Sequence, residues 1–467
     1  MKRLFYTLLF FLPCMLIACG GSDDTPDGDN NPPVVVPPDE EPVDSRLLYN
    51  GIRLPEQWPP VRSSSSELEK GMSPFYLSDK PSVINISVGR QLFVDNFLIE
   101  STNLKRTFYY PEYYSGNPIL TPEQDWEKTG TKGAAFAAPF SDGVWYDEKE
   151  GKYKMWYMAG GGSYATSGAG VTCYAESTDG IHWTKPTLSV VAGTNIVDYN
   201  SERDASVIWM DKQESNASKR YKMFLVARES GKWRYHYKTS PDGKVWRAAA
   251  QSEPIADRST VYKNPFRNVW VYSMRHNVRV DANKLIRARD YNENADPEAG
   301  TKKAEALLSA FWFGPWANEQ HHTDYPNIAP AIYNQDATPY ESIMLGFFSV
   351  WQGPENDVCA SDNVIKRNQV MVGYSRDGYS WFREDMNPFH AVNTTTSDAW
   401  NQGNLQSVAG APLIVGDKLY FYLSGRRLRG TQEITTTGLA TLRHRCDPPF
   451  GRFGRTTPLY EGRRLAL

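Results

Sequence analysis

The chain has few cysteines, and their scarcity excludes two classes of site. There are 5 cysteines in 467 residues, too few and too irregularly placed for a disulfide framework. We expect Cys173 and Cys359 to be small buried side chains and Cys446 to be a surface thiol. No histidines and cysteines have the spacing of a zinc site, so we predict no metal and no cofactor.

The chain also lacks an excess of charge, because the formal net charge is only −3. This composition provides no basic footprint for nucleic acid, so we predict no nucleic-acid partner. Long apolar runs are equally scarce. Leu4–Leu16, behind the positive start Met1-Lys-Arg, is too short to span a membrane comfortably. It predicts a signal peptide over residues 1–19.

The end of that segment predicts lipidation. Leu16-Ile-Ala-Cys19, followed by glycine, resembles the lipobox of bacterial lipoproteins. The resemblance implies that Cys19 carries lipid and anchors the mature protein to the outer membrane, exposed at the surface or to the periplasm. An ordinary secretory signal is the alternative. Residues 20–44 are rich in Pro, Asp and Gly and predict a flexible tether.

Abundant turn and strand signals repeat after residue 130. Tyr153–Met158 and Gly170–Glu176 predict neighbouring strands, which lead into the turn Ser177-Thr-Asp-Gly-Ile-His-Trp. The same Ser-x-Asp-Gly-x-x-Trp pattern returns at Ser240 and Ser375. Together with strand patterns that restart near residues 204, 257, 324 and 403, this predicts an all-β fold, a five-bladed β-propeller with four-stranded antiparallel blades. An irregular β-sandwich is the alternative.

The repeats define the expected domain organisation. Residues 131–443 form the propeller, and 45–130 form a lead-in. One of the apolar stretches Ile84–Val88 and Leu92–Ile99 is expected to supply the strand that closes the ring. Residues 444–467 are basic and rich in Pro and Gly, and they are either a native tail or the result of a frameshift near Arg443.

Polar residues stand where the innermost strand of each blade is expected to begin. They are Asp142, Arg203-Asp204, Asp257-Arg258, Thr323-Asp324 and Gln402-Gly-Asn404. In a propeller such positions crowd onto one face, where neighbouring carboxylates raise the pKa of at least one of them. We therefore predict that Asp204, Asp257 and Asp324 share one pocket. Turn capping is the alternative role of each Asp.

The layout of residues 92–442 resembles that of the five-bladed propeller glycoside hydrolases, the group of families 43, 32, 62, 68, 117 and 130. Arg203-Asp204 resembles the Arg-Asp of the family 32 motif, with Ala205 in place of its proline. The resemblance implies a base or nucleophile, an orienting Asp and a Glu proton donor at inner-strand starts. The first-blade motif is missing, and Asp257 stands where the third-blade Glu would be.

These patterns predict an exo-acting glycoside hydrolase that trims terminal sugars from a carbohydrate substrate, and we expect a monomer. Asp204 is the expected base or stabiliser, Asp257 or Glu341 the proton donor, and Asp324 a second base. The expected substrate-binding residues are Arg203, Arg258, Arg275, His322, Glu355 and Asn404, with Glu355 a further candidate donor. The alternatives are a surface glycan-binding lipoprotein without activity and a glycoside phosphorylase.

Overall fold

The computed structural model describes residues 44–64, 68, 70–128, 134–165, 170–282, 284–306, 308–396, 398–429 and 432–443. The predictions for the signal peptide, Cys19, the tether and the tail lie outside these residues. The described part is nearly all β, as expected, with only two α-helices, α2 (Pro297–Lys303) and α3 (Asn356–Asp362). Within it, no helix combines the length and the apolar character that crossing a membrane requires.

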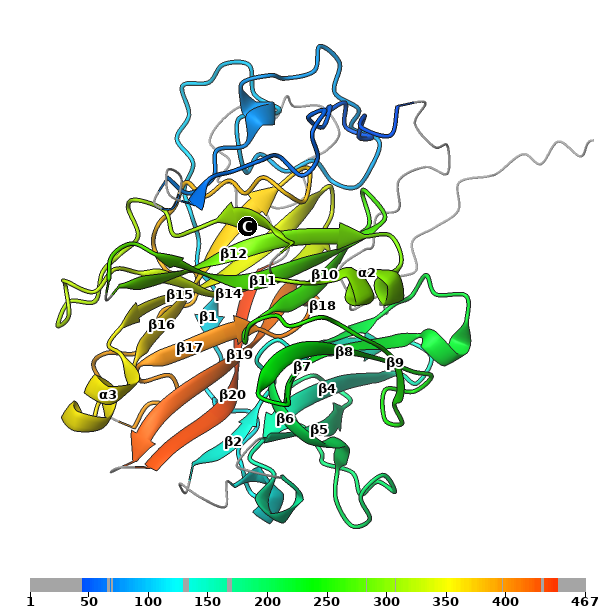
Figure 1. Cartoon of the computed structure of the whole chain (residues 1–467), viewed down its shortest axis with the longest axis vertical. Helices are drawn as coiled ribbons and strands as arrows, with labels where there is room; N and C mark the ends of the chain where they lie inside the picture. The colour runs from blue at the N-terminus through cyan, green and yellow to red at the C-terminus, as the bar shows by residue number, and fades with distance from the viewer. Residues whose placement is uncertain are drawn as a thin grey trace, which may run out of the picture.

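Consecutive strands pair as antiparallel meanders (Figure 1). The first comprises β2 (Ala135–Ala138), β3 (Val144–Asp147), β4 (Lys152–Ala159) and β5 (Gly170–Ser177). The next comprises β6 (Ile196–Met210), β7 (Tyr221–Glu229), β8 (Lys232–Ser240) and β9 (Arg247–Gln251). Because β6 pairs with β5 at its start and with β7 beyond it, the two meanders are joined.

The later strands continue the pattern. A separate sheet contains β10 (Thr260–Asn264), β11 (Val269–Arg279), β12 (Leu285–Asn294) and β13 (Ala310–Phe313). Then follow β14 (Ala331–Tyr340), β15 (Ile343–Gly353) and β16 (Arg367–Ser375). The last group is β17 (Asn404–Val408), β18 (Leu413–Val415), β19 (Lys418–Arg429) and β20 (Gln432–Arg443).

The three repeated turns have one geometry. The backbone N–H groups of Gly180, Gly243 and Gly378 donate to the serine hydroxyls at 2.9, 2.9 and 2.8 Å. Their φ angles of 74°, 76° and 74° lie in the left-handed region that favours glycine. The repetition that the sequence predicts is therefore a structural one.

The prediction that Ile84–Val88 or Leu92–Ile99 supplies the strand that closes the ring was wrong. Residues 82–100 contain no strand, whereas β1 (Glu112–Tyr113) pairs with β20 and Leu120 bridges to Thr437. The lead-in instead packs across the side of β12 and β14 to β16, at the top of Figure 1. Its Asp95 forms a fully buried ion pair with Arg376, with an Nη2–Oδ1 distance of 2.8 Å.

His390 makes stability depend on pH. It is buried against Phe389 and Phe421, neither ring nitrogen has a hydrogen-bond partner among the described residues, and burial lowers its pKa to about 3. The unfolded histidine titrates near its ordinary pKa of 6.5. The folded state is therefore at its full stability above pH 6.5 and loses stability as pH falls toward 3, because only the unfolded chain then binds the proton. We expect unfolding free energy to fall by about 2 kcal/mol between pH 7 and pH 5.

Urea denaturation at a series of pH values measures this effect. His390→Phe keeps the aromatic packing and should remove that part of the pH dependence. His321→Phe is the control, because this ring is exposed. An unchanged pH dependence in His390→Phe would contradict the assignment.

Candidate active site

Buried polar contacts join strands from distant parts of the chain. Thr260 Oγ1 donates to the carbonyl of Gln335, which joins the start of β10 to β14. Asn334 joins β14 to Ser141, with 3.3 Å between Nδ2 and Oγ, and to Ser407, with 3.2 Å between Oδ1 and Oγ. These contacts hold β10, β14, β17 and the segment before β3 together.

Asp204 and Arg258 form an ion pair at this place. The guanidinium Nη2 of Arg258 lies 2.9 Å from Asp204 Oδ1, and the backbone N–H of Arg258 donates to Asp204 Oδ2 at 2.7 Å. Arg258 has a φ of 56°, an unusual conformation for a residue with a side chain. This turn aims both donors at one carboxylate, which holds Asp204 in a fixed orientation.

Asp257 and Arg275 form a neighbouring ion pair. Burial lowers the pKa of Arg275; the Asp257 carboxylate opposes this effect, and the nearby guanidinium of Arg287 adds to it. Asp204 and Asp257 both act on the pKa values of Arg258 and Arg275. The two predicted carboxylates thus belong to one cluster with two of the predicted arginines.

Arg203 is occupied by protein groups. Its Nη2 lies 2.6 Å from Asp142 Oδ1 and its Nη1 donates to Thr172 Oγ1 at 2.6 Å. Burial raises the pKa of Asp142 to about 6, although Arg203 opposes the rise. With only 2% of its side chain exposed, Arg203 orients Asp142 instead of presenting a free guanidinium to a substrate.

Asp336 on β14 is a second buried carboxylate. Its Oδ2 accepts from the backbone N–H of Val408 at 3.0 Å and from Asn334 Nδ2 at 3.4 Å. Burial raises the pKa of Asp336 to about 7, against the effect of these hydrogen bonds. The carboxylates of this region thus differ: Asp142, Asp204 and Asp257 pair with arginines, and burial raises the pKa of Asp142 and of Asp336.

Tyr333, near the start of β14, is surrounded by cations. The charged groups of Arg258, Arg287 and Lys366 lie 5.5, 4.7 and 5.7 Å from its ring centroid. Burial alone would raise the pKa of Tyr333, but the surrounding cations, of which Arg258 contributes most, lower it to about 8. Only 7% of the residue is exposed, so the phenol is largely buried among these cations.

The other predicted residues lie apart from this cluster or form hydrogen bonds with the backbone. Asp324 has 76% of its side chain exposed and lies 3.9 Å from His322 Nδ1. Glu341 follows the far end of β14, where it binds Arg90 of the lead-in. Glu355 precedes α3 and is exposed, and Asn404 donates to the carbonyl of Lys366 at 3.1 Å. The predicted grouping of Asp324 with Asp204 and Asp257 has no supporting contact among the described residues.

Sequence reasoning missed four residues of the cluster. They are Arg287, Tyr333, Asp336 and Lys366. For three of them the one sequence signal is a position near the start of a strand. Tyr333 and Lys366 lie near the starts of β14 and β16, and Arg287 lies near the start of β12. Within the described part of the chain, no group of three or more His, Cys, Asp or Glu residues is arranged to hold a metal ion.

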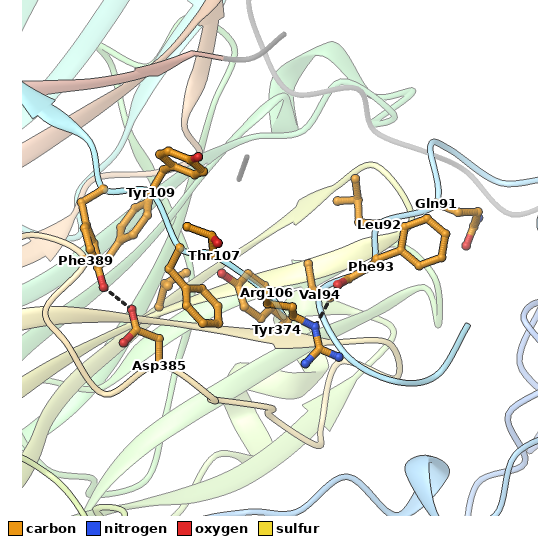
Figure 2. A pocket seen from close by; sticks show the side chains of 13 residues that line it. Gln91, Leu92, Phe93, Val94, Arg106, Thr107, Tyr109, Tyr374, Asp385 and Phe389 are labelled. Atoms are coloured by element: carbon orange, nitrogen blue, oxygen red, sulfur yellow. Dashed lines mark hydrogen bonds between the residues drawn. The ribbon is translucent and has the colours of Figure 1, made fainter. Parts of the chain in front are cut away.

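A hollow of about 70 Å³ lies elsewhere, between the lead-in and β16 (Figure 2). Its walls are mostly apolar, with Leu92, Val94, Tyr374 and Phe389 among them. Asp385 is the one carboxylate in its lining, and it accepts from Tyr110 Oη at 2.5 Å. A lone carboxylate does not provide the pair that glycoside hydrolysis uses, so this hollow is not the candidate active site.

Comparisons with known proteins give low similarities. No protein-family model matches the chain, and no curated protein matches it. Among solved structures, an N-acetylgalactosamine deacetylase from F. plautii in complex with blood group B trisaccharide is 11% identical with a TM-score of 0.43, covering 70% of this chain and 96% of its own.

Two further solved structures are similar to the same degree. A putative glycoside hydrolase from Bacteroides ovatus is 14% identical with a TM-score of 0.41, covering 71% of this chain and 96% of its own. A structure described as "The GH130 family of mannoside phosphorylases contains glycoside hydrolases that target beta-1,2 mannosidic linkages in Candida mannan" is 13% identical with a TM-score of 0.40, covering 73% and 97%.

Proposed function

We propose that the chain is an exo-acting glycoside hydrolase whose site is the cluster around Asp204, at one mouth of a five-bladed propeller. The propeller is supported by the three turns of the same geometry and by the polar contacts that join β10 and the segment before β3 to β14. A terminal sugar suits a site whose acidic groups are largely buried, because an internal sugar of a long chain could not reach them.

The observation that carries the proposal is the contrast between Asp204 and Asp336. Asp204 is an ion-paired carboxylate with two donors from Arg258, whereas burial raises the pKa of Asp336 to about 7. Glycoside hydrolysis needs such a pair, one group ionised and the other protonated near neutral pH. We assign Asp204 as base or nucleophile and Asp336 as proton donor, with Asp257 holding Arg275 in place.

The pH dependence of turnover tests the assignment of Asp336. A proton donor is active in its protonated form, so kcat should fall as pH rises above about 7. Asp336→Asn should lower kcat by about 10²-fold or more and remove this alkaline limb. Stopped assays of sugar release from pH 5 to 9 measure both effects, and an unchanged limb in the variant would contradict the assignment.

A second candidate function is glycan binding without turnover. It is favoured by the pairing of Asp142, Asp204 and Asp257 with arginines, since such pairs also occur in structural networks. Screening of oligosaccharides by affinity and by sugar release separates the two functions. Binding without release from any substrate would favour the binding protein.

We also propose that the mature chain is a monomer anchored to the outer membrane through Cys19, on the strength of the lipobox-like sequence. Cys19→Ala should release the protein from the membrane fraction or stop its processing. Fractionation and gel mobility measure this, and Cys446→Ala is the control. Identical fractionation of Cys19→Ala and the unaltered protein would contradict the anchor.

A further inference from the structure

The cations around Tyr333 outnumber the carboxylates that neutralise them. Arg258 pairs with Asp204, Arg275 with Asp257 and Arg426 with Glu433. Arg287 and Lys366 have no carboxylate partner among the described residues. Two positive charges at a largely buried phenol are therefore left without a counter-charge from the part of the chain that the structure describes.

Arg287 combines close contact with Tyr333 and a buried donor that lacks an acceptor among the described residues. Its guanidinium stacks on the Tyr333 ring at 4.7 Å, and its Nη1 is buried without a hydrogen-bond acceptor among the described residues. A buried donor without an acceptor is costly, and each such group needs an explanation such as a bound ion or ligand. The Lys366 ammonium lies 5.7 Å from the centroid of the same ring, and among the described residues its one acceptor is the amide oxygen of Asn356 at 2.9 Å.

The neighbouring strands add to the crowding of positive charge. Arg275 on β11 is paired in register with Arg289 on β12, and Arg287 stands two residues before Arg289 on the same face. Burial lowers the pKa of Arg275, and the charge of Arg287 lowers it further. Like charges placed together in this way repel unless an anion lies between or beside them.

We propose that Arg287, Lys366 and Tyr333 form an oxyanion-binding subsite for the acidic group of a substrate sugar, a carboxylate or a sulfate ester. This inference rests on the proposed function and specifies its substrate class. Arg287 presents Nη1 to one oxygen, as guanidinium groups do with carboxylates and sulfates. Lys366 adds a point charge 5.7 Å from the Tyr333 ring centroid, and the phenol is the third polar group of the subsite.

The pairing of Asp204 with Arg258 places the subsite beside the reacting carboxylate, because Arg258 also lies over the Tyr333 ring at 5.5 Å. An acidic sugar bound at Tyr333 would thus have its glycosidic bond near Asp204. The subsite therefore selects the sugar at the cleavage position, and its loss should raise KM for an acidic substrate more than it lowers kcat.

Binding of simple anions tests the subsite without any turnover. We expect inorganic sulfate and free glucuronate to raise the pKa of Tyr333, since a bound anion opposes the cations that lower it. Ultraviolet difference titration of the phenolate, with Tyr333→Phe to identify the signal, measures the shift. Arg287→Gln should weaken sulfate and glucuronate binding about tenfold or more, because a hydrogen bond to a charged group is lost.

Arg247→Gln is the matched control, since Arg247 is exposed at the start of β9 and should leave binding unchanged. Arg287→Gln removes a repelling charge and should not lower the thermal stability, and Lys366→Gln provides a second variant. If neither anion shifts the titration, or if Arg287→Gln binds both anions as the unaltered protein does, the subsite is contradicted.

Kinetics on acidic and neutral forms of one oligosaccharide complete the test. Preference for the acidic form that disappears in Arg287→Gln supports the subsite, and equal turnover of both forms contradicts it. Anion binding without turnover of any substrate would refute the hydrolase and leave the subsite standing. Turnover that requires inorganic phosphate would overturn the assignment, because the anion would then be a co-substrate.

Discussion

Asp204→Asn is expected to lower kcat by about 10²–10⁴-fold, the usual contribution of a positioned acid or base. The amide keeps the size of the side chain but cannot take a proton or attack a sugar, and it leaves the Arg258 guanidinium without its charge partner at 2.9 Å. Initial rates of sugar release, with circular dichroism as a check on folding, measure the effect.

Asp417→Asn is the control for this change, because Asp417 is exposed in the turn between β18 and β19. It should leave kcat unchanged. Asp257→Asn should have a smaller effect than Asp204→Asn, since Asp257 acts through Arg275. Wild-type rates in both Asp204→Asn and Asp336→Asn would show that these carboxylates are structural and that catalysis occurs elsewhere.

The largest loss of stability is expected from Asp95→Ala. Asp95 is fully buried and accepts from the Arg376 guanidinium through Nε at 3.0 Å and Nη2 at 2.8 Å. Removing the carboxylate leaves a buried guanidinium unpaired, which costs about 3–5 kcal/mol. Urea denaturation followed by tryptophan fluorescence measures the change in unfolding free energy.

Two further variants separate the charge effect from simple loss of packing. Asp79→Ala, at an exposed position of the same lead-in, should change the stability very little. Asp95→Leu combined with Arg376→Leu should recover part of the loss, because well-packed apolar side chains can replace a buried ion pair. A loss below 1 kcal/mol for Asp95→Ala would contradict this account of how the lead-in is fastened.

Features encoded over a few residues were predictable from the sequence. The turns at Ser177, Ser240 and Ser375 combine a glycine in the left-handed region with a serine that accepts its N–H, and both signals lie within four residues. Asp257, shortly before β10, was recognisable in the same way, whereas Asp204 lies within β6, at the register shift between Arg203 and Ser206, and not at its start.

Features that depend on long-range packing were not predictable. Arg287, Tyr333 and Lys366 come from β12, from β14 and from the residue before β16, and no local motif connects them. Nothing in the sequence around Asp336 indicates that it is buried or that it accepts from the backbone N–H of Val408. Glu341 was misjudged because the length of β14 separates it from Tyr333.

A crystal structure of Asp204→Asn with an acidic oligosaccharide would show directly where the substrate binds. We expect the terminal sugar between residue 204 and Tyr333, with its carboxylate or sulfate group within hydrogen-bond distance of Arg287 Nη1. A sugar bound instead in the apolar hollow beside Tyr374 and Asp385 (Figure 2), with the cluster at Tyr333 occupied only by solvent, would contradict it.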